Sequence, residues 1–159
     1  MSMTRRDVLQ SLPVASASLL AAFSALAAAE SAAAAQQPDL PMLPSKAWTF
    51  EELKVEKSPN GAEFRAILRG KLANGEILEV HETMLPPGGM PHPAHHHVHS
   101  EMWLVREGTV EFNVMGKKKN IGPGGLAFVA SNEEHGVTNV GKTPAKYFVV
   151  AIGPDAGLS

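Results

Sequence analysis

Histidine is concentrated in one short stretch of the chain. Five of the seven histidines fall within residues 92–99, namely His92, His95, His96, His97 and His99. Core packing does not require such a density, whereas metal binding does, because neutral imidazole is the commonest metal ligand among side chains. Cysteine is absent, so a transition metal must be held by histidine, carboxylate and water. That excludes a thiolate zinc site and an iron–sulfur cluster.

The spacing of these residues predicts that several converge on one ion. In an extended segment alternate side chains share a face, so His95, His97 and Glu101 would point the same way. Two imidazoles two residues apart, with a carboxylate four residues on, can bind one ion from a single ribbon. His96 would point to the opposite face. A fourth ligand must come from another strand, and His135 is the candidate because antiparallel ladders bring distant segments side by side.

The other histidines have alternative interpretations. His99 shares the parity of the ligands and is a candidate for substrate contact and proton transfer, although a bend before Glu101 would turn it to solvent. His92 and His96 are interpreted as surface or rim residues. His81 has Glu79 near it in sequence, which favours a hydrogen-bonded structural histidine over a catalytic one.

Short strands separated by turns must position these side chains. Strands are predicted at residues 62–68, 77–85, 101–106, 109–115, 126–130, 135–139 and 145–152. Turn signals lie between them, among them Asn60-Gly61, Asn74-Gly75 and Glu107-Gly108, and residues 116–120, with three successive lysines, are read as a solvated turn. No long amphipathic helix is visible. This pattern indicates an all-β sandwich or small barrel.

Two motifs in the chain resemble those of the cupin superfamily. The first is Gly, five residues, His-x-His, three or four residues, Glu, six residues, Gly; it is matched by Gly89, His95, His97, Glu101 and Gly108. The second is Gly, five residues, Pro-x-Gly, two residues, His, three residues, Asn; it is matched by Gly124, His135 and Asn139. Ala130 and Asn132 replace its Pro and Gly. The resemblance covers roughly residues 75–152.

The resemblance implies a double-stranded β-helix, or jelly-roll β-barrel, with a metal ion in its interior. His95, His97, Glu101 and His135 would be the ligands of one divalent transition metal ion. Such a set suits Mn, Fe, Ni, Co, Cu or Zn and leaves one or two coordination positions for water, substrate or dioxygen.

The expected function is that of an exported single-domain metal-binding cupin. A metal-dependent oxidoreductase, of the dioxygenase or oxidative-cleavage kind, acting on a small organic substrate is the first interpretation. The alternatives are a lyase or isomerase that uses the ion as a Lewis acid, and a non-catalytic protein that binds metal or a small ligand. Fold alone does not decide among them. A homodimer formed by sheet packing is expected by analogy with small cupins.

The N-terminal segment resembles a signal peptide of the twin-arginine type. Arg5-Arg6 precedes an uncharged Ala/Leu-rich stretch, residues 11–29, and the small residues Ala27 and Ala29 favour cleavage after Ala29. A membrane span is the alternative, although alanine and four serines make the stretch weakly apolar. The predicted organisation is a signal peptide at 1–29, an extended Pro/Ala-rich arm at 30–46, the barrel at 47–153 and a tail at 154–159. The mature protein would be periplasmic or secreted, after contact with the twin-arginine export machinery.

Composition and net charge argue against several other classes of function. The 159 residues, 44% of them hydrophobic, fit one domain with a real core. Formal net charge is −2, and no basic stretch is interleaved with aromatic residues, so binding to nucleic acid is not expected. Nor is membrane association expected once the signal is cleaved. The expected partner is a small-molecule substrate.

Overall fold

The computed structural model describes residues 39–158. The expected signal peptide, with Arg5-Arg6 and its cleavage site, and the first part of the expected arm lie outside the described residues. Within residues 39–158, no helix has the length and apolar character needed to cross a membrane.

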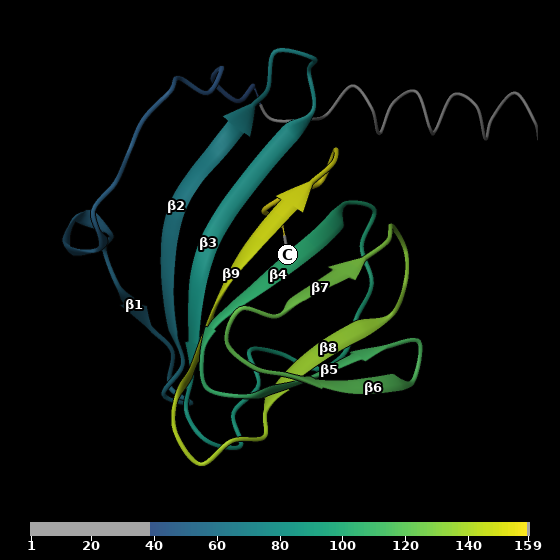
Figure 1. Cartoon of the computed structure of the whole chain (residues 1–159). Helices are drawn as coiled ribbons and strands as arrows, with labels where there is room; N and C mark the ends of the chain where they lie inside the picture. The colour runs from purple at the N-terminus through teal and green to yellow at the C-terminus, as the bar shows by residue number, and fades with distance from the viewer. Residues whose placement is uncertain (1–38, 159) are drawn as a thin grey trace, which may run out of the picture. The chain divides into compact units, whose positions relative to one another are not determined.

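Strands dominate the described part of the chain. They are β1 (Glu56–Lys57), β2 (Glu63–Lys71), β3 (Ile77–Leu85), β4 (Ser100–Glu107), β5 (Val110–Val114), β6 (Lys117–Ile121), β7 (Leu126–Val129), β8 (His135–Asn139) and β9 (Ala145–Ile152), preceded by one 3₁₀ turn, η1 (Phe50–Glu52). One sheet has the order β1-β2-β3-β9-β4-β7 and the other β6-β5-β8. Figure 1 shows β2, β3, β9 and β4 side by side in a curved sheet, with β5, β6 and β8 together beyond β7. The predicted all-β jelly-roll class is confirmed.

Alternating side chains of both sheets build one apolar core. In β9, the buried residues Ala145, Tyr147, Val149 and Ala151 alternate with partly exposed ones. Ala145, Tyr147 and Val149 form one cluster with Trp103 and Val105 of β4 and Phe112 of β5, while Ala151 packs in a smaller cluster with Ile77 and Ala156. A strand with one buried face shows this period of two, since successive side chains point to opposite sides of the sheet. The core therefore fixes which residues of β4 face inward, Glu101 among them.

All seven predicted strands are present, with shifts of a few residues at their ends. The prediction of a solvated turn at residues 116–120 is wrong in part, because residues 117–121 form β6. β6 pairs with β5 from Val114↔Lys117 to Val110↔Ile121, and Met115 (φ 50°) and Gly116 (φ 77°) make the turn. Residues 117–120 are exposed, so the segment lacks the apolar alternation by which a strand is recognised.

The segments on either side of the expected barrel, the arm and the tail, both contact it. In the arm, the Leu43 N–H donates to the Lys71 carbonyl (2.9 Å) and Met42 forms a parallel bridge with Lys71. In the expected tail, Ala156 is fully buried against Ile77. The expected tail therefore packs against the barrel through Ala156, while Pro154 and Leu158 are exposed.

Asn139, the last residue of the second motif, ties two loops together. Its side chain is fully buried, donates to the carbonyls of Leu85 (2.9 Å) and Thr143 (2.9 Å), and accepts from the Gly141 N–H (2.9 Å). These backbone groups lie where β3 ends and where β8 turns into β9. Asn139 therefore supplies hydrogen bonds that the backbone of these loops does not make itself.

We expect Asn139→Ala to lower the free energy of unfolding by about 3 kcal/mol, because buried backbone groups would lose their partners. The matched control is Asn120→Ala on exposed β6, which should change stability by less than about 0.5 kcal/mol. Urea unfolding of both variants measures the difference, and equal stability of the two would contradict the role given to Asn139.

Candidate metal centre

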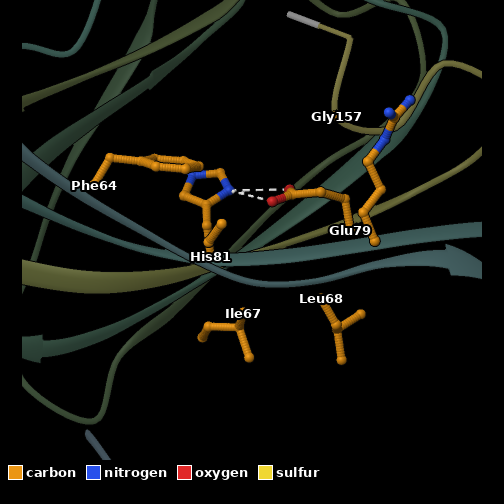
Figure 2. A pocket seen from close by; sticks show the side chains of 8 residues that line it. Phe64, Ile67, Leu68, Glu79, His81 and Gly157 are labelled. Atoms are coloured by element: carbon orange, nitrogen blue, oxygen red, sulfur yellow. Dashed lines mark hydrogen bonds and ion pairs between the residues drawn. The ribbon is translucent and has the colours of Figure 1, made fainter. Parts of the chain in front are cut away.

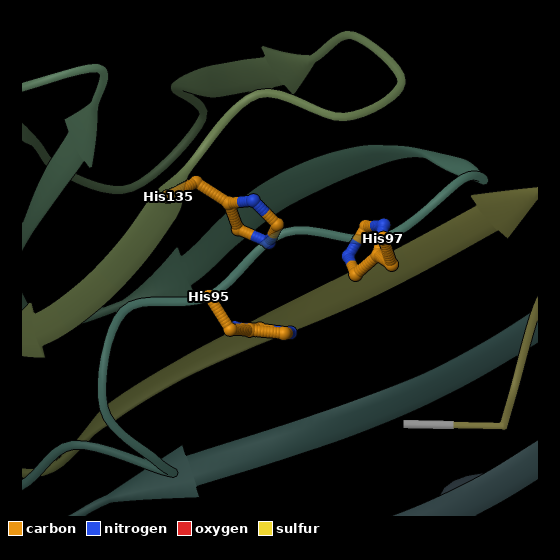
Figure 3. Close-up of side chains that lie close together, drawn as sticks. All are labelled: His95, His97 and His135. Carbon is orange, nitrogen blue, oxygen red and sulfur yellow. The ribbon is translucent and has the colours of Figure 1, made fainter.

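The expected ligands are brought together by one pair of backbone hydrogen bonds. His95 N–H donates to the His135 carbonyl (3.0 Å) and His135 N–H donates to the His95 carbonyl (2.8 Å), so the two residues form an antiparallel bridge. β4 begins only at Ser100, but the side chains of the segment before it already alternate between buried and exposed. His95, His97 and His99 are partly or fully buried, while His96 is exposed. Figure 3 shows the rings of His95, His97 and His135 close to one another.

Asn132 explains how the altered second motif keeps its turn. The residue has φ 62°, in the left-handed region where glycine is favoured and asparagine is among the best tolerated of the other residues. Its N–H donates to the His97 carbonyl (2.8 Å). Asparagine therefore takes the conformation that a glycine would take at this position of the resembled motif, and the turn holds the segment carrying His97 next to the one carrying His135.

Two of the histidines each have one ring nitrogen committed to a backbone carbonyl. His97 Nδ1 lies 2.9 Å from the His99 carbonyl, and His135 Nδ1 lies 2.9 Å from the Glu133 carbonyl. Since a carbonyl only accepts, each Nδ1 must carry the hydrogen, which leaves a lone pair on Nε2. Within residues 39–158, both Nε2 atoms are buried without a hydrogen-bond partner, as is His95 Nδ1. Buried orphaned nitrogens with fixed tautomers fit a metal ion.

The three histidines also meet a geometric condition for sharing an ion. Each of His95, His97 and His135 offers one ring nitrogen, and these nitrogens lie within 4.8 Å of one another. A second set with the same spacing is formed by His97, His99 and Glu101. A metal can therefore be held by the histidine triad, with Glu101 adjacent to it.

Glu101 lies against two of the three histidines. Its Oε1 is 3.4 Å from His97 Nε2 and its Oε2 is 3.5 Å from His135 Nε2, while the indole N–H of Trp103 donates to Oε2 (2.8 Å). Burial opposes the charged form of Glu101, but the adjacent His135 and the hydrogen bonds with His99 and Trp103 outweigh it and hold the pKa of the carboxyl far below its usual range. Glu101 therefore contributes a fixed negative charge to the centre.

The site lowers the pKa of two of the ligand histidines and raises the pKa of the third. Burial, together with the positive fields of His92 and His135, lowers the pKa of His95 to about 4. Burial likewise lowers the pKa of His97. For His135 burial acts in the same sense, but the nearby Glu101 carboxylate, 3.5 Å from Nε2, and the Glu133 carbonyl outweigh it and raise the pKa. His95 and His97 are thus neutral at neutral pH, the form that binds metal.

His99 lies behind Glu101 and connects two carboxylates. Its ring stacks on His97 (centroids 3.4 Å apart, planes at 9°), with Nε2 3.2 Å from Glu101 Oε1 and Nδ1 2.9 Å from Asp155 Oδ1. Burial lowers the pKa of His99, but hydrogen bonds to Glu101 and Asp155 outweigh it and raise the pKa. This position suits holding Glu101 in place. A proton-transfer role for His99 stays a prediction.

Asp155 is the residue of this site that sequence reasoning missed. Besides His99 Nδ1, its carboxylate accepts from the backbone N–H groups of Val98 (2.9 Å) and His99 (2.6 Å). It stands in the segment predicted as a tail, far from both motifs, and no spacing rule connects it to His99. Its only sequence signal is that it is the one carboxylate in residues 154–159.

A cavity of about 220 Å³ lies beside the ligands. Its lining is mixed apolar and polar: Phe64, His81, Thr83, Pro91, His92, His95, Glu101, Trp103, Val137, Tyr147 and Val149. Drug-sized ligands fill pockets of about 300–1,000 Å³, so this cavity suits a smaller molecule. It places such a molecule against His95 and Glu101.

Comparison with known proteins finds one matching family and several similar solved structures. Residues 81–151 match the sequence profile of the family described as Cupin domain. Among solved structures, a RmlC-like cupin from Shewanella frigidimarina NCIMB 400 is 24% identical, with a TM-score of 0.57, over 71% of this chain and 95% of that one. A predicted oxalate decarboxylase from Thermotoga maritima is 22% identical, with a TM-score of 0.58, over 68% of this chain and 99% of that one.

A third similar structure has a different described activity. The polyketide cyclase RemF from Streptomyces resistomycificus is 20% identical, with a TM-score of 0.55, over 69% of this chain and 80% of that one. No curated protein sequence is significantly similar to the chain. At these identities the structural similarity establishes the fold alone, since the same fold carries different activities.

Proposed function

From the premise that the chain has the cupin fold and that its residues 81–151 match the Cupin domain family, we propose that it is a metal-dependent enzyme acting on a small organic substrate. One observation carries this proposal: the Nε2 atoms of His97 and His135 are buried without hydrogen-bond partners among the described residues, with their tautomers fixed by backbone carbonyls. His95, His97, His135 and Glu101 would hold the ion. Bound there, a divalent transition ion would supply Lewis acidity or redox chemistry to a molecule in the adjacent cavity.

The reaction class that we propose is oxidation of the substrate with dioxygen as the oxidant. Its support is the ligand chemistry, because the charge of Glu101 lowers the net charge of the centre and favours a higher oxidation state of the ion. The cavity wall adds to this support. Trp103, Val137 and Val149 give it an apolar side, against which the apolar part of a small organic substrate can pack.

The experiment that tests this class compares turnover in air and under nitrogen. The purified protein, loaded in turn with Mn, Fe, Ni, Co, Cu or Zn, is incubated with a panel of small hydroxy acids, enols and phenols, and products are followed by mass spectrometry. We expect products only with a redox-active ion and only in air. Equal product under nitrogen would identify a lyase or isomerase instead. Metal-dependent binding of a panel member without any product would identify a binding protein.

We also propose that residues 1–29 direct export by the twin-arginine route, on the evidence of Arg5-Arg6 and the uncharged stretch that follows. Replacing both arginines with lysine keeps the charge but removes the paired-arginine feature. We expect the variant precursor to accumulate in the cytoplasm, which fractionation and immunoblotting would detect. Normal export of the variant would remove the twin-arginine interpretation.

A further inference from the structure

A histidine–carboxylate pair lies on β3, away from the segments that carry the metal ligands. His81 Nδ1 is 2.9 Å from both carboxylate oxygens of Glu79, as Figure 2 shows. Glu79 is buried (7% exposed). Because the ionised carboxylate only accepts, Nδ1 must carry the hydrogen, which leaves the lone pair on Nε2 of His81. The pair thus has the arrangement of a base oriented by a carboxylate.

The place of His81 in the barrel connects it to the metal centre. His81 lines the 220 Å³ cavity together with His95 and Glu101. It also lines a larger cavity of about 400 Å³, whose wall includes Glu79, Arg69 and Gly157. A molecule held against Glu101 would therefore share its cavity with the His81 ring.

A purely structural histidine would not need this arrangement. The ring of His81 packs on Phe64 with centroids 4.6 Å apart, and its Nδ1 bond with Glu79 satisfies one nitrogen. Within the described part of the chain no hydrogen bond engages Nε2, although the residue lines two cavities. Nε2 is therefore available to a molecule in either cavity.

We propose that His81 is the acid–base residue of this site and that Glu79 positions it; this rests on the proposed metal-dependent function. The substrate is a small acid with an ionisable O–H group, such as an enol, hydroxy acid or hydroxamic acid. The O–H bond breaks, its electron pair stays on the oxygen, and the proton forms a bond with His81 Nε2. The imidazolium so formed keeps its Nδ1–H donated to Glu79, whose negative charge stabilises it.

Proton counting by calorimetry tests this assignment without knowledge of the natural substrate. The probe is acetohydroxamic acid, which loses its proton on binding a metal, and the protein is loaded with zinc, which is redox-inert. Titrations in buffers with different ionisation enthalpies give the number of protons released to the buffer per bound probe. In the wild type we expect about zero, because His81 keeps the proton, and in His81→Gln about one. Glu79→Gln should also release protons, since the imidazolium would lose its carboxylate.

The matched control is His96→Gln, because His96 is exposed and is not among the residues that line this cavity, so this variant should behave as the wild type. His92→Gln tests the other free-standing histidine of the cavity wall: His92 lines the same cavity, and its Nδ1 lies 3.1 Å from the Pro93 carbonyl and not near a carboxylate. Zinc content and melting temperature confirm that each variant is folded, and Glu79→Gln serves if His81→Gln does not fold.

The outcomes separate the two proposals. Failure of the zinc-loaded wild type to bind the probe would contradict the metal-dependent function itself. Binding with one proton released by the wild type and by His81→Gln alike would overturn the role of His81. Proton release caused by His92→Gln, with His81→Gln unchanged, would move the base to the other wall of the cavity.

Discussion

His135→Ala should abolish tight metal binding, although His135 stands 34 or more residues from the other ligands in the sequence. The substitution removes a buried Nε2 whose tautomer is fixed by the Glu133 carbonyl. Loss of an outer-shell partner alone lowers metal affinity by about 10–100-fold, so we expect loss of a ligand to exceed about 100-fold. Elemental analysis after dialysis, together with titration of the metal-free protein, measures the effect.

His96→Ala is the matched control for that prediction. His96 lies between His95 and His97 in sequence, but its side chain is exposed, so its removal should leave metal content unchanged. If His96→Ala lost metal while His135→Ala retained it, the strand register would place the wrong face toward the ion and the ligand set would have to be redrawn.

Removal of metal should lower the melting temperature of the wild type by about 12–16 °C. Ligand binding to the folded state alone stabilises it by about 3–4 kcal/mol when free metal is 100 to 1,000 times the dissociation constant. For a domain of this size about 4 °C corresponds to each kcal/mol. The unfolded chain offers no preformed site, because the backbone bridge between His95 and His135 exists only when the two sheets are formed.

Thermal unfolding with and without a chelator checks this prediction. His135→Ala is the control, since a chain that binds metal weakly should show little change on addition of the chelator. A melting temperature of the wild type that the chelator leaves unchanged would contradict a metal site built into the fold.

Local sequence patterns predicted the strands well where one face is buried. β9 alternates buried and partly exposed residues along its whole length, and its predicted bounds, 145–152, agree with the structure. β6 was read as part of a turn because its exposed lysines carry no apolar alternation. Its pairing with β5 comes from backbone hydrogen bonds, which any side chain permits.

Local sequence patterns do not predict which distant strands pair with one another. β4 lies between β9 and β7, and no local feature of residues 100–107 identifies these neighbours. The resemblance to the cupin motifs implied the jelly-roll barrel and placed His135 and His95 in one ligand set, but it did not give the order of these strands.

In the candidate site, too, local patterns predicted some features, but contacts between distant residues could not be predicted. Alternation along residues 95–101 anticipated the exposure of His96 and the burial of His97. By contrast, Asp155 reaches His99 across 56 residues of sequence, and only the folded chain brings the two together. His81 was interpreted as structural because its hydrogen bond with Glu79 was foreseeable, whereas the cavity beside its Nε2 depends on both sheets.

Anomalous diffraction from crystals of the protein loaded with one divalent ion tests the central claim most directly. The account predicts one strong peak per chain, at about 2.0–2.2 Å from Nε2 of His97, Nε2 of His135, a ring nitrogen of His95 and a carboxylate oxygen of Glu101. A peak bound only by exposed histidines such as His92 and His96, or no peak at all in crystals soaked with excess ion, would contradict it.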